Sequence, residues 1–133
     1  MEFVKYSMAY YQGHEYYKYE KASNIAMCTL GRFLFSDIGD LSSSFKEFVY
    51  NDEEEYTSSN VTILEKKKGY VYLRDLYPVL EEEIENPTEV KMTYAQFLQL
   101  LRDLEEKVVK LRPYEVIIKC ENDRFIFETT FSA

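Results

Sequence analysis

The strongest constraint on the fold is a capped amphipathic helix in the second half of the chain. Thr93 and Gln96 are spaced as a capping box, in which the hydroxyl and the amide satisfy free backbone N–H groups at a helix start. Pro113 has no N–H to donate and ends the helix. Between them, apolar residues recur at helical spacing and form one stripe: Phe97, Leu101, Leu104, Val108 and Leu111.

Two segments with alternating apolar residues follow this helix. One face of the first segment holds Tyr114, Val116, Ile118 and Cys120. One face of the second segment holds Phe125, Phe127, Thr129 and Phe131. This alternation predicts two strands, and Asn122-Asp123 between them favours a hairpin turn.

The first part of the chain contains further strand and helix patterns. Residues 2–11 are rich in aromatic and β-branched types and predict a strand, which Gln12-Gly13-His14 ends. Ser23 is a good N-cap for a helix whose apolar residues run from Ile25 to Leu34. Residues 41–49 fit a short second helix by their apolar spacing.

The middle of the chain predicts a loop and a strand pair. Residues 51–59 are polar and predict a loop, whereas 61–64 and 70–73 predict paired strands around Lys66-Lys67-Lys68-Gly69. The resulting order, strand-helix-helix-strand-strand-helix-strand-strand, is typical of an α+β domain. We expect residues 1–133 to form a single domain with a largely antiparallel sheet packed against about three helices.

Composition limits the class of partner. With 16 basic and 24 acidic residues the net charge is −8, which opposes binding to bare nucleic acid or to an anionic membrane and favours a basic protein. No stretch is apolar over the length of a transmembrane helix, and the first residues do not resemble a secretory signal. Cys28 and Cys120 match no metal spacing. We therefore expect reduced, buried thiols in a cytoplasmic protein.

Residues that could carry catalysis are few. His14 is the only histidine, so a surface or packing role is the better interpretation than a catalytic one. None of the four glycines lies in a phosphate-binding pattern. The acidic pairs at Asp37-Asp40 and within 52–55 do not match a calcium-binding loop. We predict no enzymatic activity, no metal and no cofactor.

Two acidic runs, 52–55 and 81–85, are the candidate binding feature. Such runs are often only solvated loops that keep a protein soluble. Clustered acids can also steer a basic partner, and nearby tyrosines such as Tyr70 and Tyr72 can anchor it with aromatic area. The predicted partner-binding residues are Asp52, Glu53, Glu54, Glu55, Tyr56, Glu81, Glu82, Glu83 and Glu85.

The second half of the chain resembles a known class of inhibitor. Its segments starting at Gly69, Met92 and Pro113 are similar to small immunity proteins of bacterial polymorphic toxin systems, including contact-dependent growth inhibition. The shared pattern is a helix with Met-Thr, Phe and Leu-Leu, followed by Pro-x-Glu-Val-Ile-Ile and a hairpin. The resemblance covers about half of the chain and implies a cytosolic protein that blocks the active site or substrate access of one cognate toxin domain. Many such toxins are basic nucleases, which an acidic inhibitor would suit.

Two alternatives stand beside this expectation. An acidic nucleic-acid mimic or adaptor would bind many DNA- or RNA-processing proteins instead of one toxin. A small enzyme using carboxylates and tyrosines would lose turnover by orders of magnitude on a single Asp or Glu substitution, whereas a binding protein would weaken in a graded, salt-dependent way.

Overall fold

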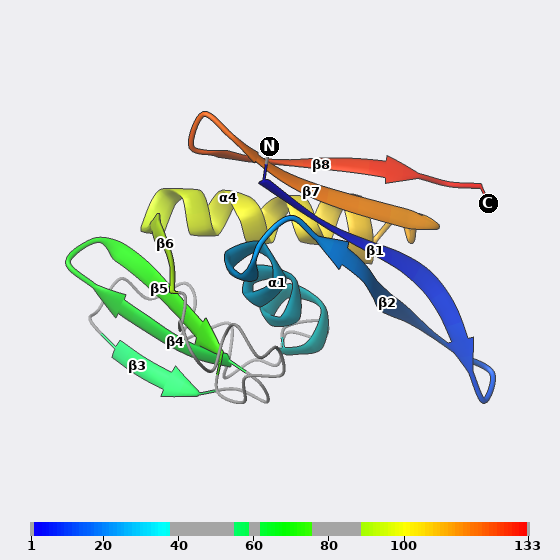
Figure 1. Ribbon diagram of the computed structural model, residues 1–133, viewed down its shortest axis with the longest axis horizontal. Coiled ribbons are helices and arrows are strands. Elements are labelled where there is room, and N and C mark those ends of the chain that lie inside the picture. The colour runs from blue at the N-terminus through cyan, green and yellow to red at the C-terminus, as the bar shows by residue number, and fades with distance from the viewer. Residues whose placement is uncertain (1, 38–54, 59–61, 76–88, 133) are drawn as a thin grey trace.

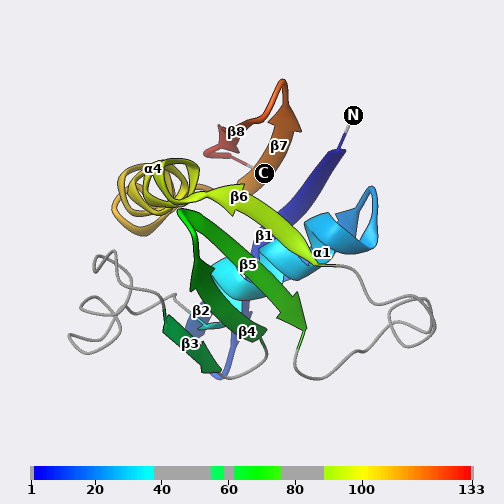
Figure 2. The same cartoon turned by 90° about the vertical axis from the view of Figure 1, so that its left-hand side faces the viewer.

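Two antiparallel sheets enclose the helices in the computed structural model, which describes residues 2–37, 55–58, 62–75 and 89–132. The first sheet, sheet A, has the strand order β2-β1-β7-β8, and the second, sheet B, has the order β3-β4-β5-β6. Helices α1 (Ile25–Arg32) and α4 (Tyr94–Leu104) lie between the sheets (Figure 1). Figure 2 looks onto sheet B, with α1 behind it and α4 nearly end-on. The α+β class with antiparallel pairing is therefore confirmed.

Sheet A is built from two hairpins. Strands β1 (Glu2–Tyr11) and β2 (His14–Ala22) form the first, and β7 (Glu115–Glu121) and β8 (Arg124–Thr130) form the second. β1 and β7 join them as the antiparallel central pair. Sheet B contains β3 (Glu55–Ser58), β4 (Thr62–Lys67), β5 (Tyr70–Asp75) and β6 (Val90–Thr93).

Three hairpins, β1–β2, β4–β5 and β7–β8, close with two-residue turns of the same kind. Gln12-Gly13, Lys68-Gly69 and Asn122-Asp123 all have positive φ at both positions, between 50° and 81°. Turns of this hand match the right-handed twist of the flanking strands. The predicted hairpin turn at Asn122-Asp123 is confirmed. The first strand ends where Gln12-Gly13-His14 predicted, and Gln12-Gly13 forms a hairpin turn into β2.

The helix starting at Thr93 is confirmed with its capping box. The Thr93 hydroxyl accepts from the Gln96 N–H at 3.1 Å, and the Gln96 amide oxygen accepts from the Thr93 N–H at 2.7 Å. The predicted stripe is buried from Phe97 to Val108. Leu111 is 57% exposed instead, because α4 passes into a π-helical turn, Glu105–Val109, and the chain then leaves the helix at Arg112 with φ 52°.

Helix α1 is confirmed, but its N-cap is Asn24 and not Ser23. The Asn24 side chain accepts from the Met27 N–H at 2.9 Å. Ser23 extends the pairing with β1 instead, since its backbone N–H donates to the Phe3 carbonyl at 2.9 Å. After Arg32 the chain continues in a π-helical turn, Phe33–Asp37.

Several sequence predictions need correction. Residues 55–58 form strand β3 and not a loop, because pairing with β4 (Glu55 opposite Lys66) overrides their polar composition. Strands β2 and β6 were not predicted, and a single sheet was expected where there are two. The described residues contain two α-helices and not about three. The helix predicted at 41–49 lies outside them.

One continuous core joins both sheets and both helices. α1 contacts β1, β2, β5 and β6, and α4 contacts β5, β6 and β8. The largest fully buried side chains are Phe33, Phe97, Leu30, Leu34, Leu64, Leu73, Leu100, Leu101, Ile118 and Val4. Because these come from every layer, the described residues behave as one packed unit.

Candidate functional site

Most of the predicted binding residues lie outside the described part of the chain. These are Asp52, Glu53, Glu54, Glu81, Glu82, Glu83 and Glu85. Glu55 and Tyr56 are described as the first two residues of β3, the edge strand of sheet B. The acidic-run assignment therefore stays a prediction.

The register of sheet B shows where the two acidic runs join the described part of the chain. The first run ends at Glu55, opposite Lys66, at the end of the sheet that carries the β4–β5 turn. The second run lies between Asp75, opposite Thr62, and Val90, at the other end of the same sheet. Both runs thus join sheet B and neither joins sheet A.

The net charge of the protein is concentrated in two segments, 38–54 and 76–88, and the rest of the chain, here called the framework, is neutral. Segments 38–54 and 76–88 contain nine acidic residues and one basic residue, which accounts for the whole net charge of −8. All other residues together hold fifteen acidic and fifteen basic side chains. A neutral framework therefore carries two strongly acidic segments, both joined to one sheet.

The outer face of sheet B carries tyrosines and basic side chains. Tyr70 and Tyr72 alternate with core residues along β5, and Tyr72 lies opposite Lys91 in the register. The Lys91 ammonium is 4.3 Å from the centroid of the Tyr70 ring and 5.8 Å from that of Tyr72, within cation–π distance. Two of the tyrosines named as possible anchors therefore share one face, with Tyr70 39% exposed.

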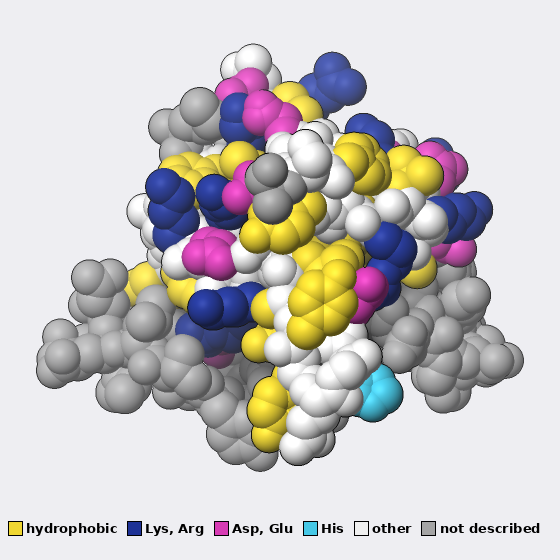
Figure 3. Space-filling view, turned by 90° about the vertical axis from the view of Figure 1, so that its right-hand side faces the viewer, with side chains coloured by type: hydrophobic (Ala, Val, Ile, Leu, Met, Phe, Trp, Pro, Cys, Tyr) yellow, Lys and Arg dark blue, Asp and Glu magenta, His cyan; other side chains and the backbone are white. Residues whose placement is uncertain are grey.

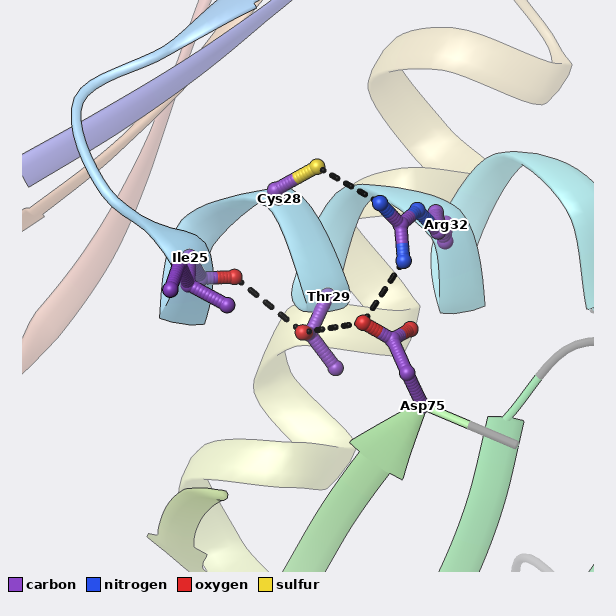
Figure 4. Close-up of polar contacts among 5 residues, drawn as sticks. All are labelled: Ile25, Cys28, Thr29, Arg32 and Asp75. Atoms are coloured by element: carbon purple, nitrogen blue, oxygen red, sulfur yellow. Dashed lines mark hydrogen bonds and ion pairs between the residues drawn. The ribbon is translucent and has the colours of Figure 1, made fainter. Parts of the chain in front are cut away.

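A polar cluster inside the molecule connects sheet B to α1 (Figure 4). Arg32 Nη1 lies 2.6 Å from Asp75 Oδ2, and the Thr29 hydroxyl donates to the same oxygen at 2.9 Å. Arg32 Nη2 also donates to Cys28 Sγ at 3.4 Å. The two charged side chains are only 14% and 5% exposed. This cluster fixes the last residue of β5, where the second acidic segment begins.

Close packing also fixes α1 against sheet A. A Cβ at Gly31 would lie 2.7 Å from Tyr6 Cε1, so glycine permits the approach of helix and strand. The Tyr6 ring stacks on Phe35 with centroids 4.1 Å apart. Burial, followed by the nearby Cys28, raises the pKa of the Tyr6 hydroxyl well above its usual value. Tyr6 therefore acts as a core side chain and stays protonated at neutral pH.

The sulfur and histidine side chains do not form a catalytic group in the described residues. Cys28 is buried, Cys120 is partly buried, and both are free thiols. Burial, with smaller contributions from Glu2 and Asp123, raises the pKa of the Cys120 thiol, which opposes formation of a nucleophilic thiolate. His14 is exposed at the start of β2. No three His, Cys, Asp or Glu side chains among the described residues are placed to hold a metal.

A surface that the sequence did not single out lies at the far end of the β1–β2 hairpin. β7 pairs with β1 only as far as Ser7, so residues 8–17 extend beyond it as a two-stranded ribbon, here called the tyrosine arm. Tyr10, Tyr11 and Tyr16 on this arm are 68%, 66% and 46% exposed. Figure 3 views the molecule from the end that carries the arm, and hydrophobic side chains run down the middle of that face.

The base of the tyrosine arm is held by the segment that enters β7. The Tyr17 hydroxyl donates to the Pro113 carbonyl at 2.7 Å. Arg112 pairs with Glu15 at 2.7 Å and lies over the Tyr17 ring. These contacts order a ribbon that would be only marginally stable alone. The missed signal was the density of tyrosines on both sides of Gln12-Gly13.

A shallow pocket of about 340 Å³ lies between α4 and the β7–β8 turn. Gln96 on its wall donates to the Asp123 carbonyl, and Gln99 donates to Asp103 at 3.0 Å. These polar groups hold one another, so the pocket is better explained as a packing depression than as a ligand site.

Comparisons with known proteins found no matching family model, no matching curated protein and no matching solved structure. Across the described residues, no helix is long and apolar enough to cross a membrane.

Proposed function

We propose that this chain is an immunity protein that binds one cognate bacterial toxin domain in the cytoplasm and blocks its active site or substrate access. The observation that carries the proposal is the division of charge. The net charge of −8 resides entirely in two segments joined to sheet B, whereas the rest of the chain is neutral. Negative charge concentrated in this way favours a basic partner and speeds its association.

The framework supports binding more than catalysis. Three polar side chains in the interior of the described residues, Arg32, Asp75 and Thr29, are bonded to one another. Thr93 and Gln96 cap α4, and Asn24 caps α1, so the elements that flank sheet B begin at fixed positions. A rigid support for two acidic segments reduces the ordering cost of binding. A basic nuclease is the partner that this charge best fits, and the likeness of the second half to immunity proteins leads to the same partner.

Affinity capture tests the proposal directly. The tagged protein is expressed in its native host, captured, washed at moderate salt and analysed by mass spectrometry for stoichiometric partners. We expect one basic polypeptide with a toxin-like C-terminal domain, whose toxicity is abolished when this protein is co-expressed. A spread of nucleic-acid enzymes would replace the proposal with a nucleic-acid mimic, and capture of no basic partner would reject it.

A further inference from the structure

The outer face of sheet B is open among the described residues. Leu64, Val71 and Met92 are buried in the core, and the residues that alternate with them point away from it. Figure 2 looks onto this face, and no described helix or strand lies in front of it. Tyrosine and arginine, which are enriched in protein interfaces, both occur here. The aromatic and charged side chains on the face are Glu65 and Lys67 from β4, Tyr70, Tyr72 and Arg74 from β5, and Lys91 from β6.

Lys91 is held over the two tyrosines of this face. Its ammonium is 4.3 Å from the centroid of the Tyr70 ring and 5.8 Å from that of Tyr72. Within the described residues no carboxylate forms an ion pair with it, so the rings order the side chain without neutralising its charge. A lysine that is already ordered in this way loses less entropy when it binds an anion.

Two more cations lie beside the tyrosines. Lys67 is opposite Tyr70 in the register, and Arg74 lies on the same face of β5. Both are exposed, and neither forms an ion pair within the described residues. Glu65 is the only acid on this face within β4, β5 and β6, and Glu89 lies just before β6. With three cations against one acid on its strands, the face attracts an anionic group, to which ammonium, guanidinium and hydroxyl donors can all bond.

The overall charge of the chain indicates which anionic partner fits. A nucleic-acid strand carries a charge at every phosphate and is repelled by a chain of net charge −8. Three cations also provide few of the phosphate contacts on which such binding depends. A protein surface with a small cluster of Asp and Glu needs only local complementarity, and the rest of that protein can be basic. The occupant that fits is therefore an acidic patch on a protein.

We propose that the outer face of sheet B docks a carboxylate-bearing patch of a protein partner, with Lys91 as the central contact. This docking rests on the proposed function and makes it more specific: the toxin domain is basic overall, and the part that seats on sheet B is acidic. The rings of Tyr70 and Tyr72 exclude water from the ion pair and so strengthen it. A basic protein without the patch is attracted by the net charge but not held, which gives selectivity for one partner.

A charge reversal at Lys91 tests the docking. Lys91→Glu and the matched control Lys21→Glu change the net charge equally, from −8 to −10. Lys21 is also exposed, and its ammonium also lies over an aromatic ring, 5.8 Å from the centroid of Phe3, but on sheet A. Surface-plasmon kinetics with the captured basic partner should give a dissociation constant at least about tenfold higher for Lys91→Glu, mostly through faster dissociation, and little change for the control. Circular dichroism checks that both variants are folded.

Carbodiimide cross-linking of the purified complex identifies the chemistry of the occupant. The reagent activates a carboxylate, an amine displaces it to form an amide, and the reagent leaves as a urea. Lys91 should therefore be linked to an Asp or Glu of the partner, which mass spectrometry of the digested complex detects. Lys91→Arg keeps the positive charge but has no primary amine, so it should bind like the wild type and lose this link.

Three results would overturn the docking. The first is a Lys91→Glu variant that binds the partner as tightly as the wild type, and the second is a Lys91 that is linked only to carboxylates of its own chain. The third is binding of a fluorescein-labelled oligothymidylate that Lys91→Glu abolishes, which would assign the face to nucleic acid. In the first two cases the partner is still bound, so the immunity function would stand. Capture of no basic partner would reject that function and the docking with it.

Discussion

Arg32 in α1 and Asp75 at the end of β5 form an ion pair of 2.6 Å inside the molecule, where their side chains are 14% and 5% exposed. Asp75 also accepts from the Thr29 hydroxyl, one turn earlier in the same helix. The carboxylate therefore ties sheet B to the helix that packs against sheet A. An ion pair so little exposed to solvent matters most when only one partner is removed.

Replacing Asp75 by Ala should lower the free energy of unfolding by about 3–5 kcal/mol, because the Arg32 guanidinium would remain buried without its carboxylate. The surface pair Lys5–Glu115, whose side chains are 27% and 31% exposed, supplies the control. Glu115→Ala should cost less than about 1 kcal/mol. Urea denaturation measures both variants, and equal losses would show that Asp75 does not carry the connection.

Gly31→Ala should destabilise the protein although alanine is the better helix former. The new methyl group would lie 2.7 Å from Tyr6 Cε1 and 3.1 Å from Val4 Cγ2. Overpacking of this kind costs about 1–3 kcal/mol, which exceeds the gain of about 1 kcal/mol from helix propensity. In a Tyr6→Ala background the closest contact is gone and only the one with Val4 remains, so the same substitution should cost clearly less. Denaturation of the four proteins in this cycle gives the coupling energy, and a coupling near zero would contradict the explanation.

The same glycine shows what could and could not be predicted from the sequence. By propensity alone Gly31 disfavours a helix, and its presence is explained by the close packing against Tyr6 and Val4. The capped helix at Thr93 and the hairpin at Asn122-Asp123 were predictable because their signals are local. β3 was not predictable, since its own residues are polar and only their pairing with β4 makes them a strand.

The candidate site, too, could be predicted from the sequence only in part. The acidic runs were visible in the sequence, but their attachment to opposite ends of one sheet required the strand register. The tyrosine arm was missed because the pattern of residues 2–11 predicts a strand without showing where its neighbour stops. Exposure of Tyr10 follows from that end point and not from the type of residue.

Thr93→Ala should cost about 1 kcal/mol of stability, the usual effect of losing an N-cap hydroxyl. Thr93→Ser keeps an oxygen that can accept from the Gln96 N–H and should cost much less. Hydrogen exchange at the first turn of α4 reports the change locally, and faster exchange there is expected only in the alanine variant. Equal exchange in both variants would show that the capping box does not order this helix start.

Stability should fall as the pH rises above about 9 to 10. Burial raises the pKa of Tyr6, Tyr17 and Tyr19 above 10.0 and that of Cys120 above 9.0. The folded protein then holds protons that the unfolded chain releases, so the stabilisation is complete below the unfolded pKa values and is lost as pH increases. Urea denaturation from pH 7 to 11 measures the slope. Tyr6→Phe keeps the ring, removes one ionisable group and should give a shallower slope, and a flat wild-type profile would refute the prediction.

Under the proposed function, reversing the charge of the first acidic run should slow association with the basic partner. Glu53→Lys/Glu54→Lys/Glu55→Lys changes the net charge from −8 to −2 and removes the acidic excess next to β3. We expect the association rate at low salt to drop about tenfold or more and the dissociation rate to change less, because steering charges act mainly on encounter.

The control Glu105→Lys/Glu106→Lys/Glu121→Lys makes the same change of net charge on other parts of the chain. Stopped-flow or surface-plasmon kinetics with the captured basic partner compare the two variants. If both variants slow association equally, overall charge is responsible and the run is not a specific site. If neither does, the acidic run has no part in binding and serves only to keep the protein soluble.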